Sequence, residues 1–505
     1  MLDSDDGYSA ARAAKSAMMG MGFVAMRPTK SRPSPSGLPG GLLTAGFIAL
    51  ALVPLLAARL SGLETVAPLH EFGTALGLTA FALVLLQFLS SGRYESLSGR
   101  VGLDRSMGFH RIAAYGLLLF AVLHPLGYVA ATFATDPSAA WARLTGMLAS
   151  PRLRSGVVAL VSLLLLVALA ALRERIGWRY ETWRASHGLM ASAVAALVLH
   201  HAFTAGAYSR EGLLYYYWIA GGAVAAVALL NVYAVRPWRM WRAGWQVESV
   251  TPLGSRTWGM TLVSRDPGRF DFRAGQFIWL TLAPNRPPFH DHPFSIASAP
   301  AELPLLRLIV REAGDCTNRF GETEPGTRVA VDGPHGSFLL DHAGKRVIMV
   351  AGGVGIAPIL GMLEEAASEG DGRSFELLYA ARTPDEVAGI ERLTALQSQL
   401  DLSVRYFVDT DARAPEFLQG PVRPDHIKEA VGLSPRDAIA YVCGPPRMME
   451  KVTDTLLELG VPAAAIHYER FDSGAGKGRL DRQRRRQAIG ILVVLVIGAV
   501  LFSLS

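Results

Sequence analysis

Five of the twelve histidines lie in or at the ends of two apolar segments. They are His110 and His124 in the segment 107–133, and His187, His200 and His201 in the segment 185–205. An ionisable side chain inside a bilayer is costly, so it is a candidate functional residue by default. A single membrane histidine can serve only to hydrogen-bond a neighbouring helix, but two sets on two helices indicate a shared chemical task.

The spacing of these histidines predicts two pairs at two depths. His110 and His124 are 14 residues apart, which on an α-helix is about four turns, or about 21 Å of rise, on nearly one face. His187 should lie at the depth of His110, because both segments are entered from the same side. Imidazole is a suitable axial ligand for haem iron, so the pairs predict two b-type haems that carry electrons across the bilayer.

The partner of His124 is open between two adjacent histidines. His200 follows His187 by 13 residues, and His201 follows it by 14. On an ideal helix these positions are rotated from His187 by about 140° and about 40°. Helix geometry alone therefore favours His201.

The composition limits the other redox centres and requires a membrane part. The two cysteines, Cys316 and Cys443, are too few for an iron–sulfur cluster, which needs four ligands, so a redox centre is flavin, haem or another metal. The chain is 50% apolar and 18% charged, more apolar than a soluble enzyme usually is. Six segments are near the roughly 20 residues that cross a bilayer, and they predict a six-helix bundle over 41–236: 41–60, 68–90, 107–133, 155–172, 185–205 and 213–235.

The arginines predict which way the bundle is oriented. They gather in three connections on one side: Arg93, Arg100 and Arg105; Arg173, Arg175, Arg179 and Arg184; Arg236, Arg239 and Arg242. The positive-inside rule makes that side cytoplasmic, so we expect a multi-pass protein of the inner cell membrane with its soluble half in the cytoplasm. The net charge of +6 then reflects topology, and nucleic-acid binding is not expected.

The two ends of the chain differ in character. The first 40 residues are rich in Ser, Pro, Gly and Met, which indicates a flexible tail and not a signal peptide. At the other end, a basic linker (473–487) precedes a seventh apolar run, 488–504. We expect this run to span the bilayer, although its 17 residues are few enough for an interfacial helix.

The soluble half divides by pattern into two domains. Residues 245–341 contain short strand-like runs separated by Pro, Gly and Asp, which favours a small antiparallel β-barrel. Residues 345–472 alternate strand-like and helical stretches, which is typical of a doubly wound α/β sheet. Its first turn, with Gly353, Gly355 and Pro358, joins a strand to a helix start and suits a diphosphate, because glycines admit close backbone approach.

This arrangement resembles the ferric reductase and NADPH oxidase superfamily, over roughly residues 40–472. In that family the histidines of the fifth segment are commonly 13 apart, and the run from Tyr180 to His187 resembles the stretch before the inner haem ligand. The resemblance therefore implies an inner haem held by His110 and His187 and an outer haem held by His124 and His200. His201 remains the rival for the outer site.

The resemblance also implies an FAD site, built from three motifs in the barrel. His292-Pro293-Phe294-Ser295 resembles the flavin motif, in which Phe294 would pack on the flavin and Ser295 would hydrogen-bond near its redox-active edge. The second motif, Arg311 with the run Gly314 to Thr317, resembles the segment that holds the FAD pyrophosphate. The third motif, the run 332–338 with Gly336 and Ser337, resembles the turn that closes the barrel.

Two further motifs resemble the nicotinamide side of the family's active site. Cys443-Gly444-Pro445 ends a later strand beside the nicotinamide, and the closing run 467–471 contains Glu469 and Phe471, whose aromatic ring would cover the flavin. Arg382 could meet a 2′-phosphate, which leaves NADH and NADPH both open.

The expected activity is electron transfer from NAD(P)H through FAD and the two haems to an acceptor across the bilayer. Oxidases of the family often carry a second histidine one turn beyond the outer ligand, where this chain has Tyr128. We therefore expect a ferric-chelate reductase, with superoxide production from dioxygen as the alternative. A haem-binding membrane transporter or sensor is the alternative of another class.

Overall fold

The computed structural model describes residues 37–90, 94, 99–210, 212–242, 244–266, 268, 270–282, 291–314, 316–412, 414–470 and 476–505. Almost all of the expected N-terminal tail lies outside these residues, and so does Phe471.

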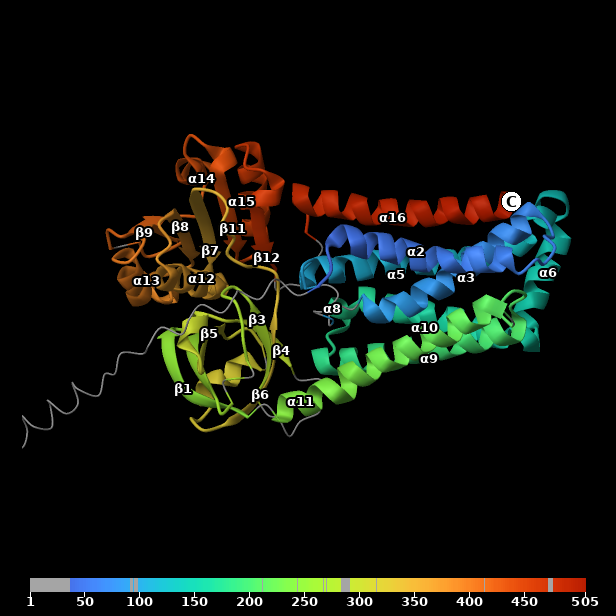
Figure 1. Cartoon of the computed structure of the whole chain (residues 1–505), viewed down its shortest axis with the longest axis horizontal. Coiled ribbons are helices and arrows are strands. Elements are labelled where there is room, and N and C mark those ends of the chain that lie inside the picture. Colours follow the sequence, from blue (N-terminus) through green and yellow to red (C-terminus); the bar gives the residue numbers. More distant parts are fainter. Residues whose placement is uncertain are drawn as a thin grey trace, which may run out of the picture. The chain divides into compact units, whose positions relative to one another are not determined.

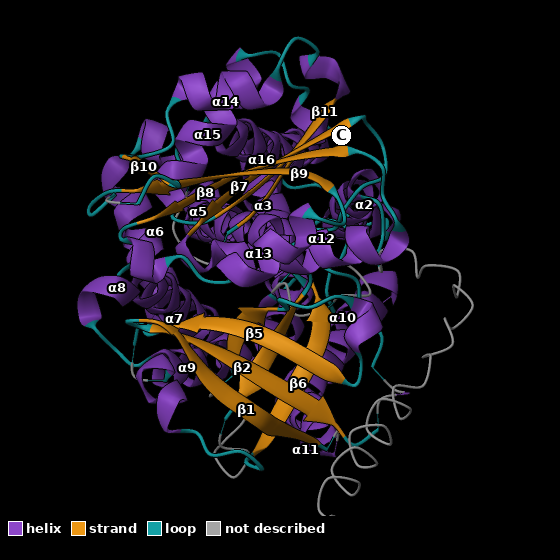
Figure 2. Cartoon of the chain, turned by 90° about the vertical axis from the view of Figure 1, so that its left-hand side faces the viewer, coloured by secondary structure: helices purple, strands orange, loops and turns teal. Residues whose placement is uncertain are grey.

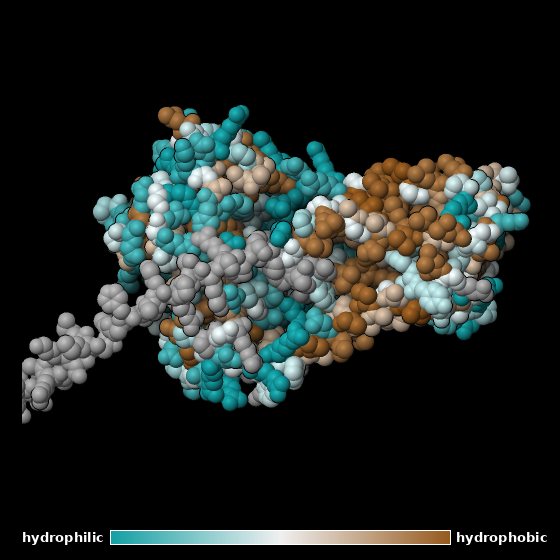
Figure 3. All heavy atoms as spheres, in the orientation of Figure 1, coloured by the Kyte–Doolittle hydropathy of each residue, from teal (hydrophilic) through white to brown (hydrophobic). Residues whose placement is uncertain are grey.

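Seven helices of the described part are long and apolar enough to cross a membrane. They are α2 (Gly40–Leu60), α3 (Pro68–Leu89), α5 (Leu103–Thr135), α7 (Arg154–Ala171), α9 (Tyr180–Ala205), α10 (Gly212–Leu230) and α16 (Arg479–Leu504). Figure 1 shows them lying alongside one another, and Figure 3 shows apolar side chains gathered on their outer surface. Shorter helices flank them: α6 (Pro137–Ala149), α8 (Arg173–Ile176) and α11 (Arg236–Arg242).

Helix α3 is the centre of this bundle. In an 18-residue apolar stretch of α3, 67% of the residues are buried, whereas 17–28% are buried in the corresponding stretches of the other six spans. It approaches α5 closely at a pair of glycines, because a Cβ atom on Gly127 would lie 2.5 Å from the Cα atom of Gly73. Small residues at such contacts let membrane helices pack backbone against backbone.

The barrel consists of six antiparallel strands in the order β4-β3-β6-β1-β2-β5. A bridge between Ile296 and Leu308 brings its two end strands together. The strands are β1 (Trp245–Gly254), β2 (Thr257–Ser264), β3 (Phe277–Thr281), β4 (His292–Ser295), β5 (Leu305–Arg311) and β6 (Arg328–His335).

The second domain is a six-stranded parallel sheet in the order β10-β9-β8-β7-β11-β12. Figure 2 shows helices α12 and α13 on one face and α14 and α15 on the other. Chain order reverses between β7 and β11, and such a switch point is where doubly wound sheets bind ligands. The elements are β7 (Arg346–Gly352), α12 (Ile356–Glu369), β8 (Ser374–Ala381), α13 (Ile390–Gln397), β9 (Asp401–Val408), β10 (Phe417–Gln419), α14 (Pro424–Val431), β11 (Ala438–Cys443), α15 (Pro446–Glu458) and β12 (Ile466–Glu469).

The predicted fold class is confirmed: a helical membrane bundle, an antiparallel barrel and a doubly wound sheet follow one another. The last apolar run is part of the bundle, because α16 packs against α2, α3 and α5. Leu495 and Ala499 on its inner face are fully buried.

Candidate functional site

The first pair of predicted haem ligands meets between α5 and α9. The ring centroids of His110 and His187 are 6.5 Å apart. A transition metal bonded to two imidazoles at about 2 Å keeps the ring centres about 6 Å apart, so this spacing fits a metal between the rings. The ring of Trp183 stacks on His187 at 5.3 Å, and Ser90 Oγ lies 3.1 Å from His110 Nδ1.

At the second pair, His124 is held with one nitrogen toward the backbone. Its Nδ1 atom lies 2.7 Å from the carbonyl oxygen of Gly73, and a hydrogen bond of this kind fixes the ring and leaves Nε2 for a metal. The ring fits because α3 carries glycine at position 77, where a Cβ atom would lie 2.5 Å from the imidazole.

The structure buries His201 more deeply than its neighbour His200. The imidazole of His201 is partly buried, and its Nδ1 atom has no hydrogen-bond partner among the described residues. It also rests against Gly156, where a Cβ atom would lie 2.6 Å from the ring. His200 is exposed on the surface of α9. This placement follows helix geometry and differs from the ligand that the family spacing implied.

The flavin motif occupies β4, at the edge of the barrel. Ser295 pairs with Phe277 of β3, and its buried hydroxyl has no hydrogen-bond partner among the described residues. A buried polar group without a protein partner calls for a ligand, so Ser295 fits the role implied for it. Phe294 contacts Phe320 with ring centroids 5.1 Å apart.

The predicted pyrophosphate segment is a compact turn that follows β5. Thr317 Oγ1 accepts hydrogen bonds from the N–H groups of Ala313 at 2.8 Å and Gly314 at 3.1 Å. Arg311, the last residue of β5, places Nη2 3.5 Å from Glu386 Oε1. Arg382 binds the same carboxylate at 2.6 Å, so one carboxylate holds the two cations predicted for FAD and nucleotide phosphates.

Glycines bring the ends of β7 and β11 into backbone contact. A Cβ atom on Gly355 would lie 2.3 Å from the carbonyl oxygen of Cys443, and one on Gly444 would lie 2.9 Å from the Cα atom of Gly352. Gly353 has φ +54°, in the left-handed region that favours glycine. The predicted Pro358 lies in the first turn of α12 and Pro445 caps α15, so both helices begin at the switch point between β7 and β11.

Cys443 and Glu469 are cross-strand neighbours at the same crevice. Burial and the charge of Glu469 raise the pKa of the Cys443 thiol well above its ordinary value, so it stays protonated. Glu469 also reaches the barrel, because its Oε1 lies 3.1 Å from where a Cβ atom of Gly336 would be. Gly336 has φ +103°. The neighbouring Ser337 hydroxyl contacts the start of α5 beside Gly102.

Sequence reasoning missed the polar contacts that join the barrel to the bundle. Arg184 forms a buried ion pair with Asp291, the residue before the flavin motif. Arg236 binds Asp332 at 3.0 Å, and His335 Nε2 lies 3.2 Å from the same carboxylate. Both arginines had been interpreted as topology markers. Nothing in their local pattern indicated a partner, although Arg184 stands three residues before His187.

Sequence reasoning also missed a polar cluster around Glu71, in the first turn of α3. Glu71 is 2% exposed, and its carboxylate accepts hydrogen bonds from Tyr208 Oη and the N–H of Val66, both at 3.1 Å. Tyr128 lies between two histidines, with ring centroids 4.7 Å from His70 and 5.1 Å from His124. A glutamate inside the predicted span 68–90 was the available signal.

A flavin-type barrel and a nucleotide-binding sheet joined to seven apolar helices define an NAD(P)H-dependent membrane oxidoreductase. Three family models match the chain in this order: ferric reductase like transmembrane component over 76–199, FAD-binding domain over 248–338, and oxidoreductase NAD-binding domain over 349–454. Together the three models match an oxidoreductase of the ferric reductase and NADPH oxidase type. Its domains support transmembrane electron transfer from NAD(P)H through FAD.

Individual proteins are similar to parts of the chain. A flavohemoprotein of Bordetella pertussis is 28% identical over 327 residues, 61% of this chain and 74% of that protein. Ferredoxin–NADP reductase B of Sorangium cellulosum is 30% identical over 235 residues, 44% of this chain and 95% of that protein. The solved FAD/NAD-binding domain of a nitric oxide dioxygenase from Vibrio cholerae is 24% identical with a TM-score of 0.41, covering 45% of this chain and 98% of that one.

Proposed function

We propose that this protein passes electrons from NAD(P)H through FAD and two b-type haems to a ferric chelate on the far side of the membrane. The observation that carries the haem proposal is the pair His110 and His187, whose ring centroids are 6.5 Å apart, a separation compatible with a metal between two imidazoles. A second set of histidines lies further along the same two helices, α5 and α9, and this supports a second haem.

Each cofactor would supply one part of the chemistry: nicotinamide gives two electrons as hydride, flavin takes up the pair and releases electrons singly, and haem accepts one at a time. The chain's own residues bind and orient these groups. Gly353 and Gly355 open the start of α12 to a diphosphate, and Cys443 and Glu469 border the position implied for the nicotinamide. Ser295 offers its hydroxyl from the barrel side.

We propose His110 with His187 as the inner ligands and His124 as one outer ligand. For the remaining position, family spacing supports His200, and the burial of the His201 ring against Gly156 supports His201. The two histidines form a natural matched pair of variants. If His201 is the ligand, His201→Ala removes the outer haem and His200→Ala keeps it.

A ferric chelate is the acceptor we propose, because Tyr128 occupies the position where oxidases of the family often carry a further histidine. Tyr128 makes a hydrogen bond to Thr74, with 3.1 Å between the hydroxyl oxygens. The second candidate is dioxygen, reduced to superoxide. Ferrous product and superoxide, measured side by side with NADH and with NADPH on purified protein, distinguish the two acceptors and the two donors.

We also propose that the soluble domains face the cytoplasm from the inner cell membrane. The arginine-rich connections and the basic start of α16 support this orientation. Reporters fused within 245–472 and after Ser505 test it. An inside signal from the first and an outside signal from the second are expected, and an outside signal from the first would overturn the proposal.

The central experiment is anaerobic reduction of the purified protein by NAD(P)H. Two low-spin bis-histidine haems should be present, and they should be reduced through the flavin. Flavin reduction without haem reduction, or the absence of haem, would refute the proposal. Slow or absent reduction of a bound haem would favour the alternative class, a haem-binding membrane transporter or sensor.

A further inference from the structure

Helix α16 is attached at both ends to different parts of the protein. Its second half is embedded in the bundle, where Leu492 fits against Gly116 of α5 and Gly498 against Leu52 of α2. Its first half is polar and extends to the nucleotide-binding domain, where it contacts α15. An α-helix rises about 1.5 Å per residue, so one continuous rod links that domain to the membrane helices.

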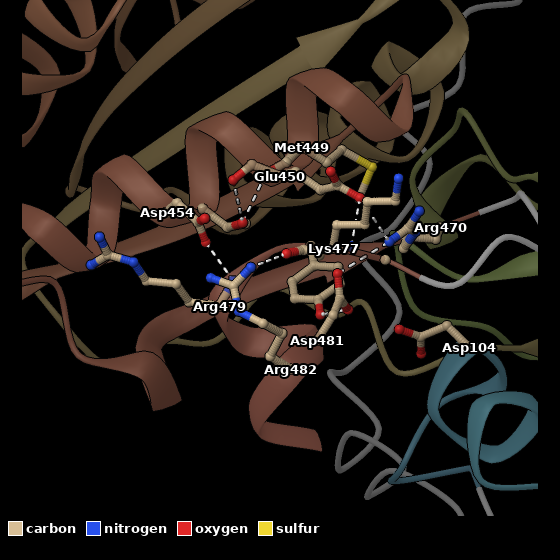
Figure 4. Close-up of polar contacts among 12 residues, drawn as sticks. Asp104, Met449, Glu450, Asp454, Arg470, Lys477, Arg479, Asp481 and Arg482 are labelled. Atoms are coloured by element: carbon tan, nitrogen blue, oxygen red, sulfur yellow. Dashed lines mark hydrogen bonds and ion pairs between the residues drawn. The ribbon is translucent and has the colours of Figure 1, made fainter. Parts of the chain in front are cut away.

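Three hydrogen bonds join α15 to Lys477, two residues before α16, and to Arg479, the first residue of α16 (Figure 4). The backbone N–H of Lys477 donates to Glu450 at 2.8 Å. The backbone N–H of Arg479 donates to Asp454 at 2.7 Å, and its guanidinium donates to Glu458 at 2.6 Å. These carboxylates lie at one-turn intervals along α15, so the chain is held over a length of that helix.

Asp481 joins α16 to the end of β12 (Figure 4). Its carboxylate accepts hydrogen bonds from Tyr468 Oη at 2.7 Å and from Arg470 Nη1 at 3.2 Å. The side chain of Arg470 is only 7% exposed. Tyr468 and Arg470 flank Glu469, so Asp481 holds the strand end that places Glu469 beside Cys443.

Arg484 carries the connection on to the membrane bundle. It lies one turn after Asp481, and its guanidinium is 4.3 Å from the ring centroid of Tyr468. Its Nη1 atom also lies 3.3 Å from Asp104 Oδ2 in the first turn of α5. Helix α5 bears His110 six residues later, so its start is a junction between the nucleotide-binding domain and the haem-bearing helix.

We propose that α16 is an intramolecular clamp that positions the nucleotide-binding domain for hydride transfer, with Asp481 and Arg484 as positioning residues. The proposal rests on the proposed function, because it assigns a role within the same electron path. The barrel has separate connections to the bundle through Arg184 and Arg236. Loosening α16 should therefore disturb the nucleotide-to-flavin step and spare the flavin-to-haem step.

Physical chemistry favours a clamp made of these groups. Asp481 pairs with the guanidinium of Arg470 and Asp104 with that of Arg484, and charge-assisted hydrogen bonds are roughly twice as strong as neutral ones. Hydride transfer needs the reacting atoms held within a narrow range of geometry, and a 1 Å misplacement can cost about a hundredfold in rate. Fixing the domain at a second point reduces such displacements.

The test separates the two electron-transfer steps in the full-length protein. Arg484→Ala and Asp481→Ala are compared with Arg486→Gln, a control that removes a charge from an exposed position on the same helix. Flavin reduction is followed by stopped flow at saturating nucleotide, and haem reduction is started separately from photoreduced flavin. We expect flavin reduction to slow roughly tenfold in both alanine variants, with flavin-to-haem transfer and the control unchanged.

Two further variants keep the test decisive if the alanine variants fold poorly. A flexible four-residue insertion between Arg482 and Gln483 keeps Asp481 on β12 and Arg484 on α5 but interrupts the helix between them, and it should slow flavin reduction alone. The exchange Asp104→Arg with Arg484→Asp should recover part of the rate lost by either single change. Unchanged flavin reduction in the insertion variant, or equal slowing of both steps, would overturn the clamp. The proposed function fails on a different result, the absence of haem reduction in the unaltered protein.

Discussion

Replacing Arg184 with alanine would leave the carboxylate of Asp291 buried without this cation. The two side chains are 10% and 5% exposed, so neither charge is well solvated where it stands. Breaking a buried ion pair by removing one partner costs about 3–5 kcal/mol. The ion pair therefore stabilises the contact between α9 and the segment that leads into the flavin motif. Arg184 lies three residues before His187 on α9.

We therefore expect Arg184→Ala to weaken the docking of the barrel on the bundle and to slow electron transfer from flavin to haem. Flavin reduction by NAD(P)H takes place within the soluble half and should persist. The assay is anaerobic stopped flow with the flavin and haem bands recorded together, alongside chemical unfolding of the detergent-solubilised protein. Arg179→Ala is the matched control, because this arginine is on the same side of the bundle and 64% exposed.

A double variant separates the ion pair from a general loss of structure. Apolar residues of similar volume can replace a buried pair at little cost, so Arg184→Met combined with Asp291→Leu should recover most of the stability lost by either single change. The coupling free energy of the cycle should be about 2–3 kcal/mol. Additive single effects, or a normal flavin-to-haem rate in Arg184→Ala, would refute this reasoning.

The other predictions concern the cofactor sites and the far end of the bundle. His187→Ala should stop electron transfer beyond the flavin while flavin reduction continues, and normal haem reduction would contradict the inner-site assignment. His201→Ala should remove the outer haem spectrum and His200→Ala should spare it; the reverse result would favour the family spacing over the geometry. Glu71→Ala should destabilise the protein by about 1–3 kcal/mol, because it leaves the buried hydroxyl of Tyr208 without this acceptor; chemical unfolding measures the loss, and Glu71→Gln should recover part of it. Because the pKa of Cys443 is raised by burial, its thiol should resist alkylation in the folded protein at pH 8 and react after unfolding, as mass spectrometry can determine.

Local sequence was sufficient for the architecture. Length and apolarity identified the membrane helices, because lipid requires about 20 apolar residues per span. Short strand-like runs predicted the barrel, and alternating strands and helices predicted the second soluble domain, whose first turn was marked by the glycines at 353 and 355. These features depend on each segment's own composition, so they can be read along the chain.

Tertiary structure decided how distant side chains meet. Which of two adjacent histidines is buried depends on the rotation of α9 within the bundle, and here the His201 ring packs against Gly156 while His200 is exposed. The pairing of Arg184 with Asp291 joins residues 107 positions apart, and that of Arg484 with Asp104 joins residues 380 apart. An arginine looks the same in the sequence whether it marks topology or fills a buried ion pair, because only the folded chain supplies the carboxylate.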